Sequence, residues 1–228
     1  MFKRAILPTI IVILLSPVWV EANAFRKLSF SLSPAGFWAL HGRYNNSYDL
    51  SDMMMQGAGL ELSFRYNVNE SFLIDVGYSY NWMYMKESRQ PAAYDDNKPA
   101  LVMPMYTLNG ILFLASGGLK PYLTFGGGLC PWKFSTYVSG GETFSAPGNA
   151  SEEFSKTSLV LNAGFGAELF LWPKLSVLAE ASYLFIFTKD AEKFGTEIFG
   201  NQGMLGFSVG ICYYFGRPGR SSDDTSHK

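Results

Sequence analysis

The chain has 228 residues, enough for one domain or at most two, and charged residues make up 16% of it, against about 25% in an average protein. Aromatic residues also make up 16%, yet downstream of the N-terminus no apolar run reaches the roughly 20 residues that a membrane helix needs. This composition argues against a helical membrane protein and favours a sheet with one face in lipid. A formal net charge of −1 gives no support for nucleic-acid binding.

The N-terminus has the pattern of an export signal. Lys3 and Arg4 precede an apolar stretch over residues 5–20, and the small-x-small triplet Ala-Asn-Ala follows at residues 22–24. The apolar stretch is short for a membrane anchor, and two prolines interrupt it. The sequence therefore predicts a signal peptide over residues 1–24 that is cleaved after Ala24.

Eight segments then alternate apolar side chains with small or polar ones, which is typical of strands that separate lipid from a lumen. In chain order they are residues 26–40, 55–66, 71–85, 100–114, 120–133, 157–171, 175–188 and 203–215. The third is the clearest, with seven apolar or aromatic residues on one face. The fourth is the weakest, because both faces are apolar over residues 111–114; Thr107 and Asn109 indicate that its odd-numbered residues point inward.

Short and long connections alternate strictly between these segments. The short ones are residues 67–70, 115–119 and 172–174, and the long polar ones are about 41–54, 86–99, 134–156 and 189–202. Outer-membrane barrels have short turns on the periplasmic side and long loops on the outer side. The sequence therefore predicts an all-β fold, an eight-stranded antiparallel up-and-down transmembrane β-barrel over residues 25–215.

Aromatic residues recur at the heights where such a barrel would leave the membrane, and they are candidates for two aromatic girdles. The candidates on the outer side are Trp38, Trp82, Tyr84 and Trp132. Those on the periplasmic side are Tyr66, Trp172, Tyr213 and Phe215. The alternative, aromatic residues that fill a soluble core, leaves the sorting of the connections unexplained.

Five charged residues are expected to point into the lumen: Arg65, Glu61, Asp75, Glu168 and Glu180. The interior of an eight-stranded barrel is just wide enough for side chains to fill, so charges there must be paired or hydrated. Arg65 is the only clearly inward base, and we expect the carboxylates to surround it. This network is either a structural plug or an ion gate in a narrow pore, and the excess of carboxylates would make any leak cation-selective.

The sequence gives little support for catalysis or metal binding. Cys130 and Cys212 are expected near opposite ends of the barrel, whereas disulfide partners need Cα atoms within about 7 Å, so we expect two unpaired thiols. The two cysteines and two histidines have no metal-binding spacing, and no cofactor is expected. His41 lies near Ser47 and Asp49 in the sequence, which resembles a catalytic triad only by composition, so no enzyme is expected.

Several short stretches carry a resemblance to a known family. They are residues 120–122 (Lys-Pro-Tyr), 126–128 (Gly-Gly-Gly), 164–168 (Gly-Phe-Gly-Ala-Glu), 179–183 (Ala-Glu-Ala-Ser-Tyr) and 210–215. Over residues 25–215 the chain resembles the small outer-membrane β-barrels, which include the OmpA membrane domain, OmpX and the opacity-type porins. The resemblance implies a place in the cell outer membrane, contact with outer-membrane lipid and lipopolysaccharide, and recognition of the strand that ends at Phe215 by the barrel-assembly machinery. Many members end on that aromatic residue, whereas here a polar segment follows, residues 216–228, expected to be a disordered periplasmic tail.

Loops are the expected place of specific function. The longest loop, about 134–156, combines acidic and aromatic residues and is the candidate site for a surface ligand. The sequence favours a structural or surface-interaction role. A narrow porin-like channel is the alternative, a lipid A-modifying enzyme comes third, and a soluble lipocalin-like barrel comes last.

Overall fold

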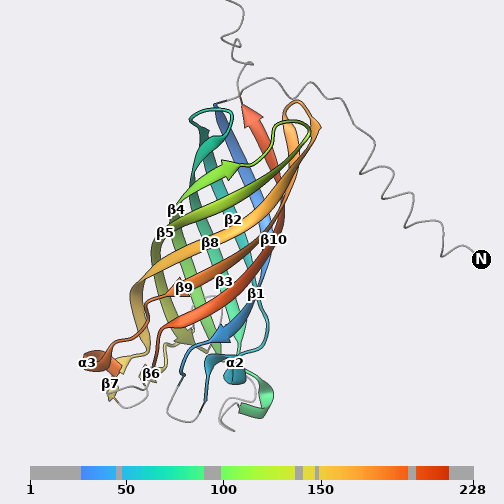
Figure 1. Ribbon diagram of the computed structural model, residues 1–228. Helices are drawn as coiled ribbons and strands as arrows, with labels where there is room; N and C mark the ends of the chain where they lie inside the picture. Colours follow the sequence, from blue (N-terminus) through green and yellow to red (C-terminus); the bar gives the residue numbers. More distant parts are fainter. Residues whose placement is uncertain are drawn as a thin grey trace, which may run out of the picture.

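The computed structural model describes residues 27–44, 48–89, 99–136, 141–146, 149–194 and 199–215. Eight antiparallel strands close into a barrel in the order β1-β10-β9-β8-β5-β4-β3-β2 (Figure 1). The strands are β1 (Leu28–His41), β2 (Gly57–Asn67), β3 (Phe72–Tyr84), β4 (Ala100–Phe113), β5 (Leu119–Ser135), β8 (Ser155–Trp172), β9 (Leu175–Ile186) and β10 (Gln202–Phe215). Each begins and ends within two residues of its predicted segment, so the predicted fold class is confirmed.

The period-two pattern sorts the side chains between the lumen and the outer surface. In β1, Ser29 is fully buried and faces inward, while the adjacent Phe30 is 40% exposed on the outer surface. Inward and outward positions alternate in this way in every strand, and in β4 the odd-numbered residues point inward as predicted. Because β1 pairs with β10, from Leu28 opposite Phe215 onward, the sheet has no free edge.

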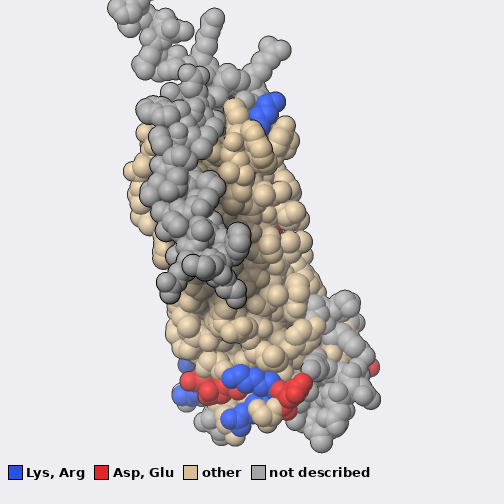
Figure 2. All heavy atoms as spheres, turned by 90° about the vertical axis from the view of Figure 1, so that its right-hand side faces the viewer, with Lys and Arg blue, Asp and Glu red and all other residues tan. Residues whose placement is uncertain are grey.

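The outer surface of the wall is apolar. On the face that Figure 2 shows, Lys, Arg, Asp and Glu gather at one end of the barrel, with a basic patch at the other, and the wall between is almost free of charge. Exposed apolar patches wider than a few hundred Å² are rare on soluble monomers. No helix in the described part of the chain is long and apolar enough to cross a membrane.

The connections are sorted by length between the two ends of the barrel (Figure 1). At the turn end the strands join through short turns, one of which uses Gly117 at φ +124° and another the Asn69 side chain, which accepts hydrogen bonds from two backbone N–H groups. At the loop end the long connections contain short elements. They are α2 (Leu50–Met53), the 3₁₀-helix η1 (Glu87–Arg89), β6 (Ser145–Ala146), β7 (Asn149–Glu153) and α3 (Ala191–Phe194).

The lumen is divided into a polar part and an apolar part. Toward the loop end it is filled by a cluster that we call the apolar plug. Its residues are Phe37, Leu50, Met53, Met54, Met83, Met85, Leu101, Met103, Met105, Cys130, Trp132, Phe134, Ala146, Phe154, Val160, Leu184, Ile186, Phe194, Phe199 and Met204. Two smaller clusters lie near the turn end, one around Tyr122 and one around Tyr214.

The placement of Trp132 in a girdle is wrong, because this residue belongs to the plug. Trp132 is 2% exposed, and its indole Nε1 donates a hydrogen bond to Ser158 Oγ at 2.9 Å. In β5 the even-numbered residues face the lumen, as Tyr122 and Thr124 do, and Trp132 follows the same parity. Six of the other seven girdle candidates follow the outward parity of their strands. Trp172 has the inward, even parity of β8, but the register shifts between Phe170 and Trp172, and Trp172 is 60% exposed at the end of the strand.

Candidate functional site

A buried ion pair lies in the polar part of the lumen. Arg65 on β2 and Asp75 on β3 stand directly opposite each other in the strand register, so both side chains enter the lumen side by side. Arg65 Nε lies 3.1 Å from Asp75 Oδ2, and both side chains are at most 5% exposed. Glu168 reaches Arg65 from β8, with 3.9 Å between Oε2 and Nη1. Arg65 therefore bridges two carboxylates across the barrel.

Neutral donors bind one oxygen of each of these two carboxylates, while Glu168 Oε2 accepts no hydrogen bond. Asp75 Oδ1 accepts a hydrogen bond from Asn109 Nδ2 at 3.2 Å. Glu168 Oε1 accepts hydrogen bonds from Tyr214 Oη, at 2.6 Å, and from Ser176 Oγ. A buried carboxylate needs such partners to offset its lost hydration. Sequence reasoning missed these donors, although their inward parity could have indicated them.

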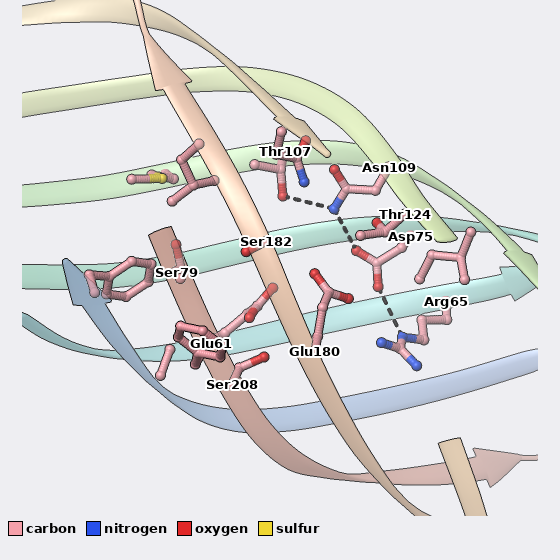
Figure 3. Close-up of a pocket in the computed structure, with 18 residues that line it drawn as sticks. Glu61, Arg65, Asp75, Ser79, Thr107, Asn109, Thr124, Glu180, Ser182 and Ser208 are labelled. Atoms are coloured by element: carbon pink, nitrogen blue, oxygen red, sulfur yellow. Dashed lines mark hydrogen bonds and ion pairs between the residues drawn. The ribbon is translucent and has the colours of Figure 1, made fainter. Parts of the chain in front are cut away.

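Glu61 and Glu180 form no ion pair with Arg65, although they share the lining of one cavity with Arg65 and Asp75. They line a cavity of about 50 Å³ in the middle of the lumen, together with serines from three strands (Figure 3). Glu180 Oε2 accepts a hydrogen bond from Tyr122 Oη at 3.1 Å. No lysine or arginine among the described residues forms an ion pair with either carboxylate. The cavity has room for a few water molecules, and Arg65 also lines it, so water and the nearby guanidinium can both offset the charge of these carboxylates.

A second inward base, Lys120, lies at the turn end of β5. Its Nζ sits 5.4 Å from the ring centroid of Phe113 and 5.2 Å from that of Phe170. The expectation that Arg65 is the only inward base is therefore corrected. The signal was available, since Lys120 has the same parity as the buried Tyr122.

The lumen is closed toward the loop end by the plug. Met103, Met105 and Met204 are each at most 2% exposed. Aromatic rings from separate segments pack above them: Phe134 stacks on Phe154 with 4.6 Å between the ring centroids, and Trp132 lies 5.0 Å from Phe199. In the described part of the chain, these side chains occupy the path from the polar cavity to the loop end.

Hydrogen bonds tie the long connections to one another. Lys86 Nζ donates to Ser51 O at 2.8 Å, which joins the second connection to the first. The backbone N–H of Gly200 donates to Arg43 O at 3.0 Å, which joins the fourth to the first. Lys193 Nζ donates to Ser155 O at 2.7 Å, which joins the fourth to the start of β8. These four segments thus form a connected rim.

An ion pair between Lys156 and Asp190 adds to this rim, with 3.2 Å between Nζ and Oδ2. The backbone N–H of Lys193 also donates to Asp190 Oδ1. That hydrogen bond, together with the Lys156 ammonium, holds the pKa of the Asp190 carboxyl below its ordinary value.

His41 does not sit in a triad. A bulge between Ala39 and His41 shifts the register and turns the imidazole to the outer surface, where Nε2 lies 2.6 Å from Tyr183 Oη. The backbone of Asp49 forms an isolated antiparallel β-bridge with that of Arg43, and Ser47 lies outside the described residues. Both cysteines are free, as predicted, and both are buried. The predicted signal peptide, its cleavage site and the tail over residues 216–228 also lie outside the described residues.

Known proteins share this architecture. Neisserial surface protein A is 17% identical, with a TM-score of 0.56 over 82% of this chain and 97% of its own. Ail of Yersinia pestis, solved with the heparin analogue sucrose octasulfate, is 16% identical, with a TM-score of 0.47 over 84% of this chain and 100% of its own. OprG of Pseudomonas aeruginosa is 11% identical, with a TM-score of 0.43 over 85% and 98%. At these identities the likeness concerns the fold alone.

Sequence comparison gives the family. No curated protein sequence matches the chain significantly. A family model described as an outer membrane protein beta-barrel domain matches residues 18–215, which is most of the chain. The chain therefore belongs to this family of outer-membrane β-barrels, and its place is the outer membrane.

Proposed function

We propose that the protein is a surface-interaction barrel, in which the wall is an anchor and the long connections at the loop end bind a partner outside the cell. The observation that carries this proposal is the apolar plug, because each long connection contributes side chains to it. The first contributes Leu50, Met53 and Met54, the second Met85, the third Ala146 and Phe154, and the fourth Phe194 and Phe199. A plug built in this way stabilises the rim as well as the barrel.

A rim held in this way suits recognition. Ordering mobile loops on binding costs free energy, and loops that are already packed avoid most of that cost. The third connection offers contact groups, since Glu142, Glu152 and Glu153 are exposed. A partner with a basic surface fits these carboxylates best, because complementary charge favours encounter and register.

Other roles have weaker support. The cavity beside Glu61 and Glu180 is the observation that favours a narrow channel, but the plug lies between it and the loop end. An enzymatic role would need an activated nucleophile, and the contact from His41 goes to Tyr183 on the outer surface. At the C-terminal end of β10, the exposed ring of Phe215 supports recognition of this strand by the barrel-assembly machinery.

Adhesion of whole cells tests the proposal. A non-adherent laboratory bacterium that produces the full chain is expected to bind host-cell monolayers above the level of cells with an empty vector. The variant Glu142→Gln/Glu152→Gln/Glu153→Gln is expected to return to that level, while Glu70→Gln at the turn end keeps full adhesion. Heat-modifiable migration on gels verifies equal amounts of folded barrel.

Two outcomes of this experiment oppose the proposal. Adhesion of producing cells no higher than that of vector cells would refute the surface-interaction role on this substrate. Full adhesion by the triple variant would refute the part assigned to the third connection.

A further inference from the structure

Two prolines face each other in the barrel wall. In the register of β4 and β5, Tyr106 pairs with Leu129 and Val102 pairs with Lys133. This register places Pro104 on β4 opposite Pro131 on β5. The three residue pairs that lie between the two flanking pairs make no ladder contact. The backbone N–H of Leu114 donates to Pro121 O, so even-numbered residues of β4 bond toward β5. Pro104 and Pro131 should therefore exchange two hydrogen bonds, and neither has an N–H to donate.

The ladder between β4 and β5 is consequently interrupted. With about 3.4 Å per residue, roughly 14 Å of wall between the flanking bonded pairs carries no hydrogen bond. Proline inside a sheet is normally confined to edges and bulges, because it removes ladder bonds. This wall segment, which we call the proline seam, lies at the height of Trp82, since Trp82 pairs with Val102.

A groove of about 870 Å³ lies over the proline seam on the outside of the barrel. Its lining residues include both prolines, Val102 and Tyr80 on the apolar side and three lysines: Lys133, Lys156 and Lys193. No acidic residue is among the described residues that line it. Within the described part of the chain no carboxylate pairs with Lys133, whereas Asp190 pairs with Lys156. The groove thus combines an apolar floor with net positive charge.

Position and chemistry together identify an occupant. The groove opens on the surface that faces lipid, at the level of girdle candidates, where an acyl chain meets its headgroup. Lysine ammonium groups bind phosphate oxygens through charge-assisted hydrogen bonds, and long lysine side chains reach the membrane interface from an apolar surface. We infer that the groove over the proline seam binds a phosphorylated, acylated glycolipid of the outer leaflet, with an acyl chain against the prolines and a phosphate between the lysines. This inference does not depend on the adhesive role of the loops.

Retention of lipid A by the purified full chain tests the inference. The protein is reconstituted in phosphatidylcholine vesicles that contain diphosphoryl lipid A at about 5 mol%, a dilute probe that favours specific sites. The lipid that the protein retains after detergent release is counted by native mass spectrometry. Lys133→Gln is expected to weaken retention about tenfold, the effect of losing one charge-assisted hydrogen bond. The matched control Lys174→Gln removes the same charge at the turn end and should retain lipid A as the unaltered chain does.

Two further arms separate the headgroup from the acyl chain. Thr157→Trp, which places a bulky ring in the groove, should also reduce retention, and dephosphorylated lipid A should be retained about tenfold less than the diphosphoryl form. The inference is overturned if the unaltered chain retains no lipid A, if Lys133→Gln and Lys174→Gln behave alike, or if phosphatidylglycerol is retained as well as lipid A. Heat-modifiable migration verifies that each variant is folded.

Discussion

Arg65 is the residue around which the buried charges of the lumen are arranged. Its guanidinium has two acidic partners in a buried site, and its position opposite Asp75 follows directly from the strand register. Glu61 and Glu180 share the same lumen without a cation of their own among the described residues. Removing one member of a buried pair leaves an uncompensated charge, whereas neutralising a carboxylate without a cation does not.

Asp75→Asn and Glu61→Gln should therefore have different effects on the free energy of unfolding. Loss of the Asp75 carboxylate is expected to lower the free energy of unfolding by about 3 kcal/mol, because Arg65 keeps only the more distant Glu168. Glu61→Gln should leave the stability unchanged or raise it. Urea unfolding in lipid vesicles, followed by tryptophan fluorescence, measures both. Equal losses in the two variants would contradict the assignment of Arg65 to Asp75.

At the scale of the element, the ladder between β4 and β5 is interrupted at the proline seam. The backbone N–H groups of Tyr106 and Lys133 flank the proline seam, while those of Leu108 and Leu112 lie in the intact part of the same ladder. Amide exchange follows local opening, which is easiest where neighbouring hydrogen bonds are missing.

Hydrogen exchange of the reconstituted barrel should reveal this difference. We expect the amides of Tyr106 and Lys133 to exchange at least about tenfold faster than those of Leu108 and Leu112, a local opening about 1.4 kcal/mol easier. Equal protection along the ladder would show that the two prolines do not weaken the wall.

The fourth connection is expected to respond to acid. The folded-state pKa of Asp190 lies below its ordinary value, so its contribution to stability is present above the unfolded pKa of about 3.9 and is lost as the pH falls through the folded value. Limited digestion with pepsin should therefore cut the segment around α3 faster as the pH drops below that value. In Asp190→Asn the rate, corrected for the activity of pepsin itself, should not change with pH; a parallel dependence would contradict the role of this pair.

For the whole molecule, local pattern was sufficient for the barrel and insufficient for its contents. Alternation along each strand fixes parity, and short turns such as the one after β2 fix which residues stand opposite, so Arg65 and Asp75 could be brought together from the sequence. The indole of Trp132 is typical of a girdle, but its even parity in β5 places it in the lumen, so parity is the better guide at this position. Phe154, Phe194 and Phe199 fold back over the lumen from long connections, and no periodicity in those segments predicts such a return.

The plug is proposed to close this barrel and to hold its rim for contact. Planar-bilayer recording of the purified, folded, full-length protein tests this proposal most directly. We expect no conductance steps above the baseline of the bilayer, because Met103, Met105 and Met204 fill the path from the cavity beside Glu61 and Glu180 to the loop end. Reproducible cation-selective steps in most insertions would contradict this expectation and would make the protein a narrow channel.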